Sequence, residues 1–152
     1  MTDLHIVPSK VLNLMAFVPA EDFELSRRFY RDLGFHENWG DAQACQLELQ
    51  GYRFLLQNFY VKDHAGNFMM HLMVEDADKW WEHIQNIGLK ERYELSMVKP
   101  PELQPWGLRV LYLADPIHPA CCGTLPIGLR LKPLILSLCK MFFGIRNSRV
   151  RT

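Results

Sequence analysis

The spacing of apolar residues along the chain predicts an α+β fold that begins with a strand and a helix. Leu12–Val18 is an apolar run of strand length, and Asp22 offers an N-cap for a helix that follows. Apolar residues then recur at helical spacing until Gly34, which suits the end of a helix. Three strand-like stretches come next: "FHENW", "ACQLELQ" and "YRFLLQNFY".

The same order of elements then restarts. "FMMHLMVED" is strand-like, Asp76 or Asp78 offers an N-cap, and Gly88 ends the helix. The separations Asp22 to Asp76 and Gly34 to Gly88 are both 54 residues, which favours an internal duplication over chance. "RYELSM" and "LRVLYLA" continue as strands, and "VKPPELQPW" is expected to be a proline-rich loop between them. We therefore predict one domain over residues 1–152, with one module over about 11–60 and a second over about 68–116.

Charge divides the chain into an acidic body and a basic tail. All 17 Asp and Glu lie between Asp3 and Asp115, a region with eleven Lys and Arg and hence a net charge of −6. The other six basic residues follow Asp115, with no acid among them. An acidic body favours a small cationic ligand over nucleic acid, although an ordinary solvated surface would show the same balance.

The location is predicted from what the sequence lacks. The N-terminus has no apolar core of signal-peptide length, and the four cysteines fit a reduced, cytoplasmic chain. The apolar run Pro133–Cys139 is far shorter than the roughly 20 residues that span a bilayer, so no membrane partner is expected.

Two segments carry a resemblance to a known family. "FVPAEDFELSRRFYRDLGF" resembles the first strand and helix of the vicinal oxygen chelate superfamily, and "PPELQPWGLRVLYLADP" resembles a segment of bleomycin resistance proteins. The similarity covers Val11–Pro116. It implies paired βαβββ modules with curved mixed sheets, each forming half of a cup, and a homodimer with its grooves between the subunits. Bleomycin resistance proteins sequester a cationic antibiotic in these grooves without catalysis.

The resemblance also allows an alternative, because relatives such as glyoxalases and extradiol dioxygenases hold a divalent metal with His and Glu. His71 matches one ligand position of the family. Residues Asn13–Met15 contain no His or Glu where another ligand should fall, and Gln57 stands where many members have Glu. We therefore predict no metal or cofactor. No nucleophile-base constellation stands out either, so no catalytic residue is predicted, and a metal-dependent lyase or dioxygenase is kept as the alternative.

A binding site is expected on the walls or rim of the cup, where flat aromatic rings and acids suit a planar cationic ligand. Trp106 matches the Trp-Gly position of the family and is the first candidate. The other candidates are Trp39, Phe59, Tyr60, Tyr93, Glu48 and Glu102. Phe54, Trp80 and Trp81 are expected to pack in the core instead. Pro8, in the arm before the first strand, either hooks over a second subunit or forms an ordinary turn.

The chain departs from the family after Asp115-Pro116. In the family this turn leads through a glycine into a last strand such as Gly-Val-Leu-Trp-His-Ile, but here "IHPACCGTLP" follows. The codons allowed for this stretch permit a Gly-Val-Leu-Trp series in another frame. Our hypothesis is a frame-shifted tail over residues 117–152, which leaves the second module without its native last strand. A divergent natural C-terminus is the alternative, and "GLRLKP" could pair as a substitute strand. A frame-shifted, non-functional relative is then a third functional outcome.

Overall fold

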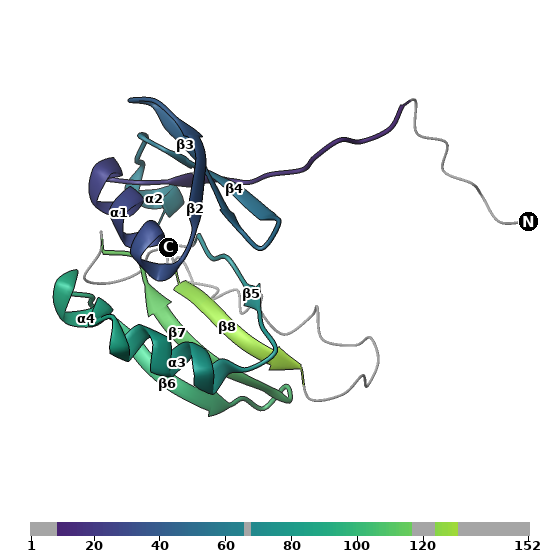
Figure 1. The fold of residues 1–152 in the computed structure, drawn as a ribbon, viewed down its shortest axis with the longest axis vertical. Helices are drawn as coiled ribbons and strands as arrows, with labels where there is room; N and C mark the ends of the chain where they lie inside the picture. Colours follow the sequence, from purple (N-terminus) through teal and green to yellow (C-terminus); the bar gives the residue numbers. More distant parts are fainter. Residues whose placement is uncertain (1–8, 66–67, 117–123, 131–152) are drawn as a thin grey trace, which may run out of the picture.

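The computed structural model describes residues 9–65, 68–116 and 124–130 (Figure 1). The first unit consists of β1 (Phe17–Pro19), α1 (Phe23–Leu33), β2 (His36–Gly40), β3 (Ala44–Leu49) and β4 (Tyr52–Gln57). A short helix, α2 (Lys62–Ala65), leads to the second unit. That unit consists of β5 (Leu72–Met73), α3 (Ala77–Asn86), α4 (Leu89–Arg92), β6 (Val98–Leu103), β7 (Leu108–Ala114) and β8 (Thr124–Arg130).

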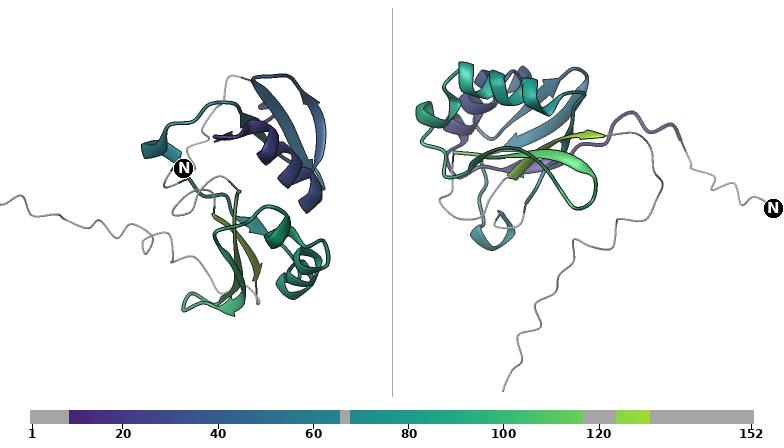
Figure 2. Two further views of the ribbon diagram at one scale, coloured as in Figure 1. Left: turned by 90° about the vertical axis from the view of Figure 1, so that its left-hand side faces the viewer. Right: turned by 90° about the horizontal axis from the view of Figure 1, so that it is seen from below.

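The two units have the same sheet topology. Their strand orders are β1-β4-β3-β2 and β5-β8-β7-β6, and in each sheet the first and last strands of the unit pair in parallel. The remaining neighbours pair antiparallel. The predicted α+β class and the paired βαβββ modules are confirmed, and the two sheets form separate lobes (Figures 1 and 2).

The 54-residue repeat has a structural basis at both ends of the main helices. The carboxylate of Asp22 accepts a hydrogen bond from the backbone N–H of Leu25 at 2.9 Å. Asp76, rather than Asp78, caps α3 in the same way. Gly34 and Gly88 both have positive φ, 119° and 60°, a conformation that glycine adopts without strain.

The first strand of each unit is shorter than predicted. Leu12 and Leu14 precede β1 and are 88% and 91% exposed, so most of the apolar run Leu12–Val18 is an arm that extends from the body (Figure 1). Only Leu72 and Met73 of "FMMHLMVED" form β5. An apolar run becomes a strand only where a neighbour pairs with it, and β4 reaches β1 only from Phe17 onward.

The predictions for "RYELSM" and "VKPPELQPW" were wrong. The first stretch contains the end of α4 and the turn after it, and the second supplies β6. A proline disrupts a strand only where its missing N–H would have bonded to a neighbouring strand. Because β6 is an edge strand, one of its two sides has no neighbour in the sheet. Pro100 and Pro101 fall within the bulge between Lys99 and Glu102, where the register with β7 shifts.

The second sheet contains a last strand. β8 lies between β5 and β7, in the place that β4 occupies in the first sheet. Residues Thr124–Arg130 therefore fill the position for which the sequence showed no obvious strand. This strand starts at Thr124, four residues before the predicted substitute strand "GLRLKP", which begins at Gly128. Pro126 and Gly128 hid the alternation of Leu125, Ile127 and Leu129. Pro8 and the predicted tail outside 124–130 lie outside the described residues.

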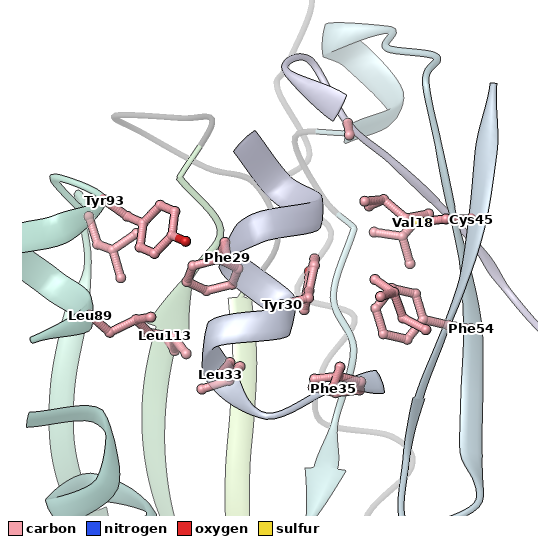
Figure 3. Close-up of a cluster of buried hydrophobic side chains, with 14 of the residues drawn as sticks. Val18, Phe29, Tyr30, Leu33, Phe35, Cys45, Phe54, Leu89, Tyr93 and Leu113 are labelled. Carbon is pink, nitrogen blue, oxygen red and sulfur yellow. The ribbon is translucent and has the colours of Figure 1, made fainter. Parts of the chain in front are cut away.

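One core joins the two units, with α1 at its centre (Figure 3). Phe29 and Leu33 of α1 point toward the second unit, where they meet Leu113 and residues of α4. Tyr30 points the other way, and its ring meets Phe54 edge to face at a centroid distance of 5.0 Å. Phe54 is 6% exposed, and Trp80 and Trp81 pack against the core, so the packing predicted for these residues is confirmed.

Candidate functional site

Each sheet has an inner face on the shared core and an outer face turned away from it. In β3, Cys45 and Leu47 are fully buried in the core. Gln46 and Glu48 alternate with them, so their side chains belong to the outer face of the first sheet. The predicted candidates can be placed by the same alternation.

One row of side chains crosses the outer face of the first sheet. The register aligns Phe17 with Leu55, Leu55 with Gln46, and Gln46 with Trp39. Residues that pair directly share a face. Phe17 and Trp39 at the ends of the row are 55% and 48% exposed, so two aromatic side chains flank a polar amide.

A β-bulge brings Trp39 to this outer face. Glu37 pairs with Leu47 on the inner face, whereas Trp39 pairs with Gln46 on the outer face, and the register shifts between them. In a regular strand two residues this far apart would share a face. On the inner side the Glu37 carboxylate accepts a hydrogen bond from Arg27 Nε of α1 at 3.3 Å.

Glu48 supplies a carboxylate on the same face as Trp39. Its Oε2 accepts hydrogen bonds from Asn38 Nδ2, at 2.9 Å, and from Arg53 Nε. These bonds, that of Asn38 first, hold the pKa of the Glu48 carboxyl below its usual range, so the group is ionised at neutral pH. Both donors bind Oε2, and among the described residues no hydrogen bond reaches Oε1.

Glu102 belongs to the outer face of the second sheet. Leu111 and Leu113 of β7 are in the shared core, so Val110, the neighbour of Leu111, belongs to the opposite face. Glu102 pairs with Val110 and is exposed. The register continues from Val110 across β8 to Met73, which is 48% exposed.

Trp106 lies in the turn between β6 and β7. The turn is closed by hydrogen bonds from Gly107 N to Gln104 O, at 2.9 Å, and from Gln104 N to Leu108 O, at 2.8 Å. Gly107 has a φ of +81°, which explains the glycine after the tryptophan. The indole of Trp106 is half-buried at the end of this hairpin.

The other aromatic candidates separate into two places. Phe59, 59% exposed, and the half-buried Tyr60 follow the end of β4 at the rim of the first sheet. Tyr93 is only 9% exposed and packs edge to face on Phe29 in the shared core. Its hydroxyl donates to Asp32 Oδ2 at 2.7 Å, so Tyr93 contributes to neither outer face.

Two residues stand at the metal-ligand positions of the resemblance, His71 with an imidazole and Gln57 with an amide. His71 lies just before β5 with much of its surface exposed, and desolvation of its remaining part lowers the pKa of its imidazole. Gln57 pairs with Pro19 and Ala44 at the end of β4. Within residues 9–65 and 68–116, no three His, Cys, Asp or Glu side chains come close enough together to hold a metal ion.

A polar contact that the sequence did not predict joins the two units. Ser26 of α1 is fully buried, and its Oγ donates to Asp115 Oδ1 at 3.0 Å, just after β7. Burial and the neighbouring Asp115 raise the pKa of the Tyr30 hydroxyl well above its usual value. Asp115 thus binds α1 of the first unit. In the sequence, Asp115 could be singled out because it belongs to the Asp-Pro of the segment that resembles bleomycin resistance proteins.

No helix in the described part of the chain is both long and apolar enough to cross a membrane.

Comparisons with known proteins agree with this architecture. The family model described as "Glyoxalase/Bleomycin resistance protein/Dioxygenase superfamily" matches residues 10–118. No curated protein matches the chain in sequence. A bleomycin-binding protein solved in complex with bleomycin is 21% identical and has a TM-score of 0.63, over 79% of this chain and 99% of its own.

Two further solved structures have the same fold. A bleomycin resistance determinant encoded on the transposon Tn5 is 20% identical with a TM-score of 0.63, over 79% of this chain and 99% of its own. Lactoylglutathione lyase from Agrobacterium tumefaciens is 17% identical with a TM-score of 0.56, over 80% of this chain and 96% of its own. The vicinal oxygen chelate fold that the sequence implied is therefore confirmed.

Proposed function

Because this chain belongs to the glyoxalase/bleomycin resistance protein/dioxygenase superfamily, we propose that it binds and sequesters a cationic small molecule of the bleomycin type without catalysis. The superfamily contains both bleomycin-binding proteins and lactoylglutathione lyases, so family membership leaves the choice open. The side chains on the outer faces of the two sheets favour binding.

The observation that carries the proposal is the exposed aromatic ring on the same face of the first sheet as an ionised carboxylate. Trp39 is 48% exposed on the outer face, and Glu48 on that face has an oxygen, Oε1, without a hydrogen bond from the described residues. An indole face and a carboxylate together suit a planar ligand that carries positive charge. The excess of acids over bases between Asp3 and Asp115 adds a longer-range attraction for a cation.

The proposed groove requires two copies of the chain. Both outer faces point away from the shared core, so one chain does not bring Trp39 and Glu48 of the first sheet next to Glu102 of the second. A homodimer in which the first sheet of one copy faces the second sheet of the other would do so. The arm before β1 supports this assembly, because Leu12 and Leu14 expose apolar surface that a second copy would bury.

Titration of the tryptophan fluorescence with bleomycin tests the binding proposal. We expect saturable quenching of the wild-type protein, and weaker binding of Trp39→Phe, Trp106→Phe and Glu48→Gln variants. Trp81→Phe, which alters an indole packed against the core, is the matched control and should retain binding. The absence of saturable quenching at micromolar bleomycin in folded protein would refute sequestration and favour the non-functional relative.

Sedimentation velocity tests the dimer. The wild-type protein should sediment as a dimer at micromolar concentration, and the double variant Leu12→Ser/Leu14→Ser should shift toward monomer and lose bleomycin binding in parallel. A wild-type monomer that binds bleomycin with a stoichiometry of one would contradict the two-copy groove.

A cytoplasmic location remains part of this proposal.

The alternative, a metal-dependent lyase or dioxygenase, would need ligands that the described residues do not bring together. Metal analysis of the purified protein distinguishes the two functions. A tightly bound divalent metal at one equivalent per chain would favour the enzyme, and its loss in a His71→Ala variant would place the metal at that position.

A further inference from the structure

A pocket of about 490 Å³ opens on the helical side of the molecule, between α1 and α4. It is lined by Leu25, Arg28, Arg31, Asp32, Arg92 and Tyr93. The first four residues come from the first unit and the last two from the second, so the pocket exists only because the two units pack together. None of these residues belongs to the outer faces described above, so the pocket is separate from the proposed groove.

A single carboxylate organises the wall that the second unit supplies. Asp32 Oδ2 accepts a hydrogen bond from the Tyr93 hydroxyl at 2.7 Å and another from Arg92 Nη1 at 2.8 Å. Burial, with the Asp32 carboxylate second, raises the pKa of Tyr93 to about 12, so its hydroxyl remains a donor at neutral pH. Arg92 is thereby held at the pocket with its other guanidinium donors available.

The opposite wall carries two arginines, Arg28 and Arg31, with few acidic contacts from the described residues. Arg28 and Arg31 are one helical turn apart on α1 and therefore lie on one side of that helix. Among the described residues Arg28 forms no ion pair, and the contact of Arg31 with Glu37 is long, at 3.9 Å. Three guanidinium groups and one carboxylate give the lining a net charge of +2, in a region whose overall net charge is −6.

Arg27, the preceding residue, shows what a structural arginine of this helix looks like. Its guanidinium binds both Glu37 and Glu24, the latter at 2.7 Å, and these partners, Glu37 first, raise its pKa. In the part of the chain that the structure describes, neither Arg28 nor Arg31 has two close acidic partners in this way. Their charges also suit the C-terminal end of the α1 dipole. However, the last carbonyls of α1 already accept hydrogen bonds from Gly34 N, Phe35 N and the His83 ring.

We propose that this pocket binds a small oxyanion, specifically a phosphate group, either free or as part of a small organic phosphate. Arg28 and Arg31 would donate from α1 and Arg92 from α4, and guanidinium groups match phosphate oxygens in geometry and charge. Because its walls come from both units, the bound anion stabilises the contact of α1 with α4. The site goes beyond the proposed antibiotic binding and does not rest on it.

Isothermal titration calorimetry of the full chain with inorganic phosphate, at constant ionic strength set with sodium chloride, tests the site. A parallel titration with glycerol 3-phosphate distinguishes a free anion from a phosphate ester as the preferred ligand. We expect saturable binding of at least one probe with one site per chain. Phosphate that fails to bind at millimolar concentration, together with no binding of the ester, would overturn the proposal.

Charge variants locate the binding. The exposed Arg28→Gln and Arg31→Gln substitutions should each weaken binding about tenfold, the expected effect of one lost charge-assisted hydrogen bond. Lys90→Gln removes a positive charge from α4 outside the pocket lining and should change the dissociation constant less than about twofold. Equal weakening by all three variants would show a nonspecific charge effect and overturn the site. Circular dichroism and the thermal midpoint, both expected to be unchanged without phosphate, confirm that the variants fold.

Discussion

The last strands of the two units, β4 and β8, occupy the same place in their sheets with very different sequences. β4 pairs with β1 from Phe17 to Pro19 and with β3 along its whole length. β8 pairs with β7 along its whole length but reaches β5 only at Leu72 and Met73. The same topology is thus completed by two strands whose attachment to the parallel neighbour differs.

The two strands also differ in sequence. In β4 three consecutive side chains, Phe54, Leu55 and Leu56, are buried, so both faces of the strand contribute to burial. β8 carries Pro126 and Gly128 in its interior; the proline has no N–H to donate and the glycine has no side chain to pack. The place of the last strand is therefore set by its neighbours, and a sequence poorly suited to a strand can fill it.

The largest expected loss of stability comes from placing a proline inside β4, as Pro126 already lies inside β8. Leu55→Pro removes the hydrogen bond from Leu55 N to Ala16 O, 2.9 Å long, in a strand with neighbours on both sides. The lost leucine side chain and the unpaired Ala16 O should together cost about 3 kcal/mol or more of the free energy of unfolding, measured by urea denaturation. Leu55→Val is the control and should cost less than about 1.5 kcal/mol. Equal losses in both variants would mean that the first sheet tolerates a broken central strand as the second does.

A smaller loss of stability is expected from a substitution at the end of β2, where the first sheet packs closely near α1. A Cβ added at Gly40 would lie 2.5 Å from Glu37 Oε1 and 2.8 Å from Cys45 Cβ. Gly40→Ala should therefore destabilise the protein by about 1–3 kcal/mol through overpacking. Native-state alkylation of Cys45, which is buried and whose pKa burial raises to about 11, should accelerate in this variant. An unchanged labelling rate would contradict tight packing of the first unit.

Replacing the proline inside β8 should instead stabilise the protein modestly. Pro126→Thr restores a backbone N–H in a strand that pairs with Tyr112 of β7 and introduces a residue that favours strands. We expect a gain of up to about 1 kcal/mol in the free energy of unfolding, and slower amide hydrogen exchange in β7. Faster exchange in β7 would show that the proline is needed at this position.

The smallest effect concerns the pH dependence of the contact between the units. Bonds from Tyr93, first, and from Arg92 lower the pKa of Asp32, so its ionised form stabilises the folded chain above the usual carboxyl pKa. That stabilisation is lost as the pH falls through the lowered pKa. The difference in the free energy of unfolding between wild type and Tyr93→Phe should therefore be constant near neutral pH and shrink on acidification. Asp32 is partly exposed, so solvent screening keeps the change small.

Asp78 provides a control within a single unit for that pH series. Its pKa is lowered by Arg109 of β7, and the pair does not join the two units. Introducing Asp78→Asn into both proteins should leave the difference between wild type and Tyr93→Phe unchanged at every pH. A changed profile would mean that the two carboxylates are coupled through the core.

The parts of the fold that the sequence predicted are those with a local physical cause. Asp22 and Asp76 cap their helices through their own side chains, and Gly34 and Gly88 adopt positive φ where the helices end. These features need no distant partner, so their 54-residue spacing was enough to infer the duplication. The alternation of "ACQLELQ" located β3 for the same reason.

The parts that the sequence did not predict depend on partners far along the chain. β6 forms across Pro100 and Pro101 because β7 pairs on both sides of the bulge. Tyr93 resembled a rim residue in sequence, but the packing of α4 on α1 places it in the core against Phe29. The pocket between α1 and α4 combines residues far apart in sequence, Asp32 and Arg92, which no local pattern connects.

The candidate ligand faces show the same division. Glu48 could be placed on the outer face from strand alternation alone. Trp39 reaches that face only because of the bulge after Glu37, and a bulge is set by the pairing of two strands rather than by the sequence of one. That these residues hold a ligand stays a prediction until binding is measured.

Hydrogen–deuterium exchange of the full chain, with and without saturating bleomycin, would show which parts of the fold the ligand covers. We expect slower exchange in β2 and β3 around Trp39 and Glu48, and in the β6–β7 turn that carries Trp106. Exchange in α1 and α4 should change little. Protection confined to the helical side, or binding without protection of either outer face, would contradict a groove built from these two sheets.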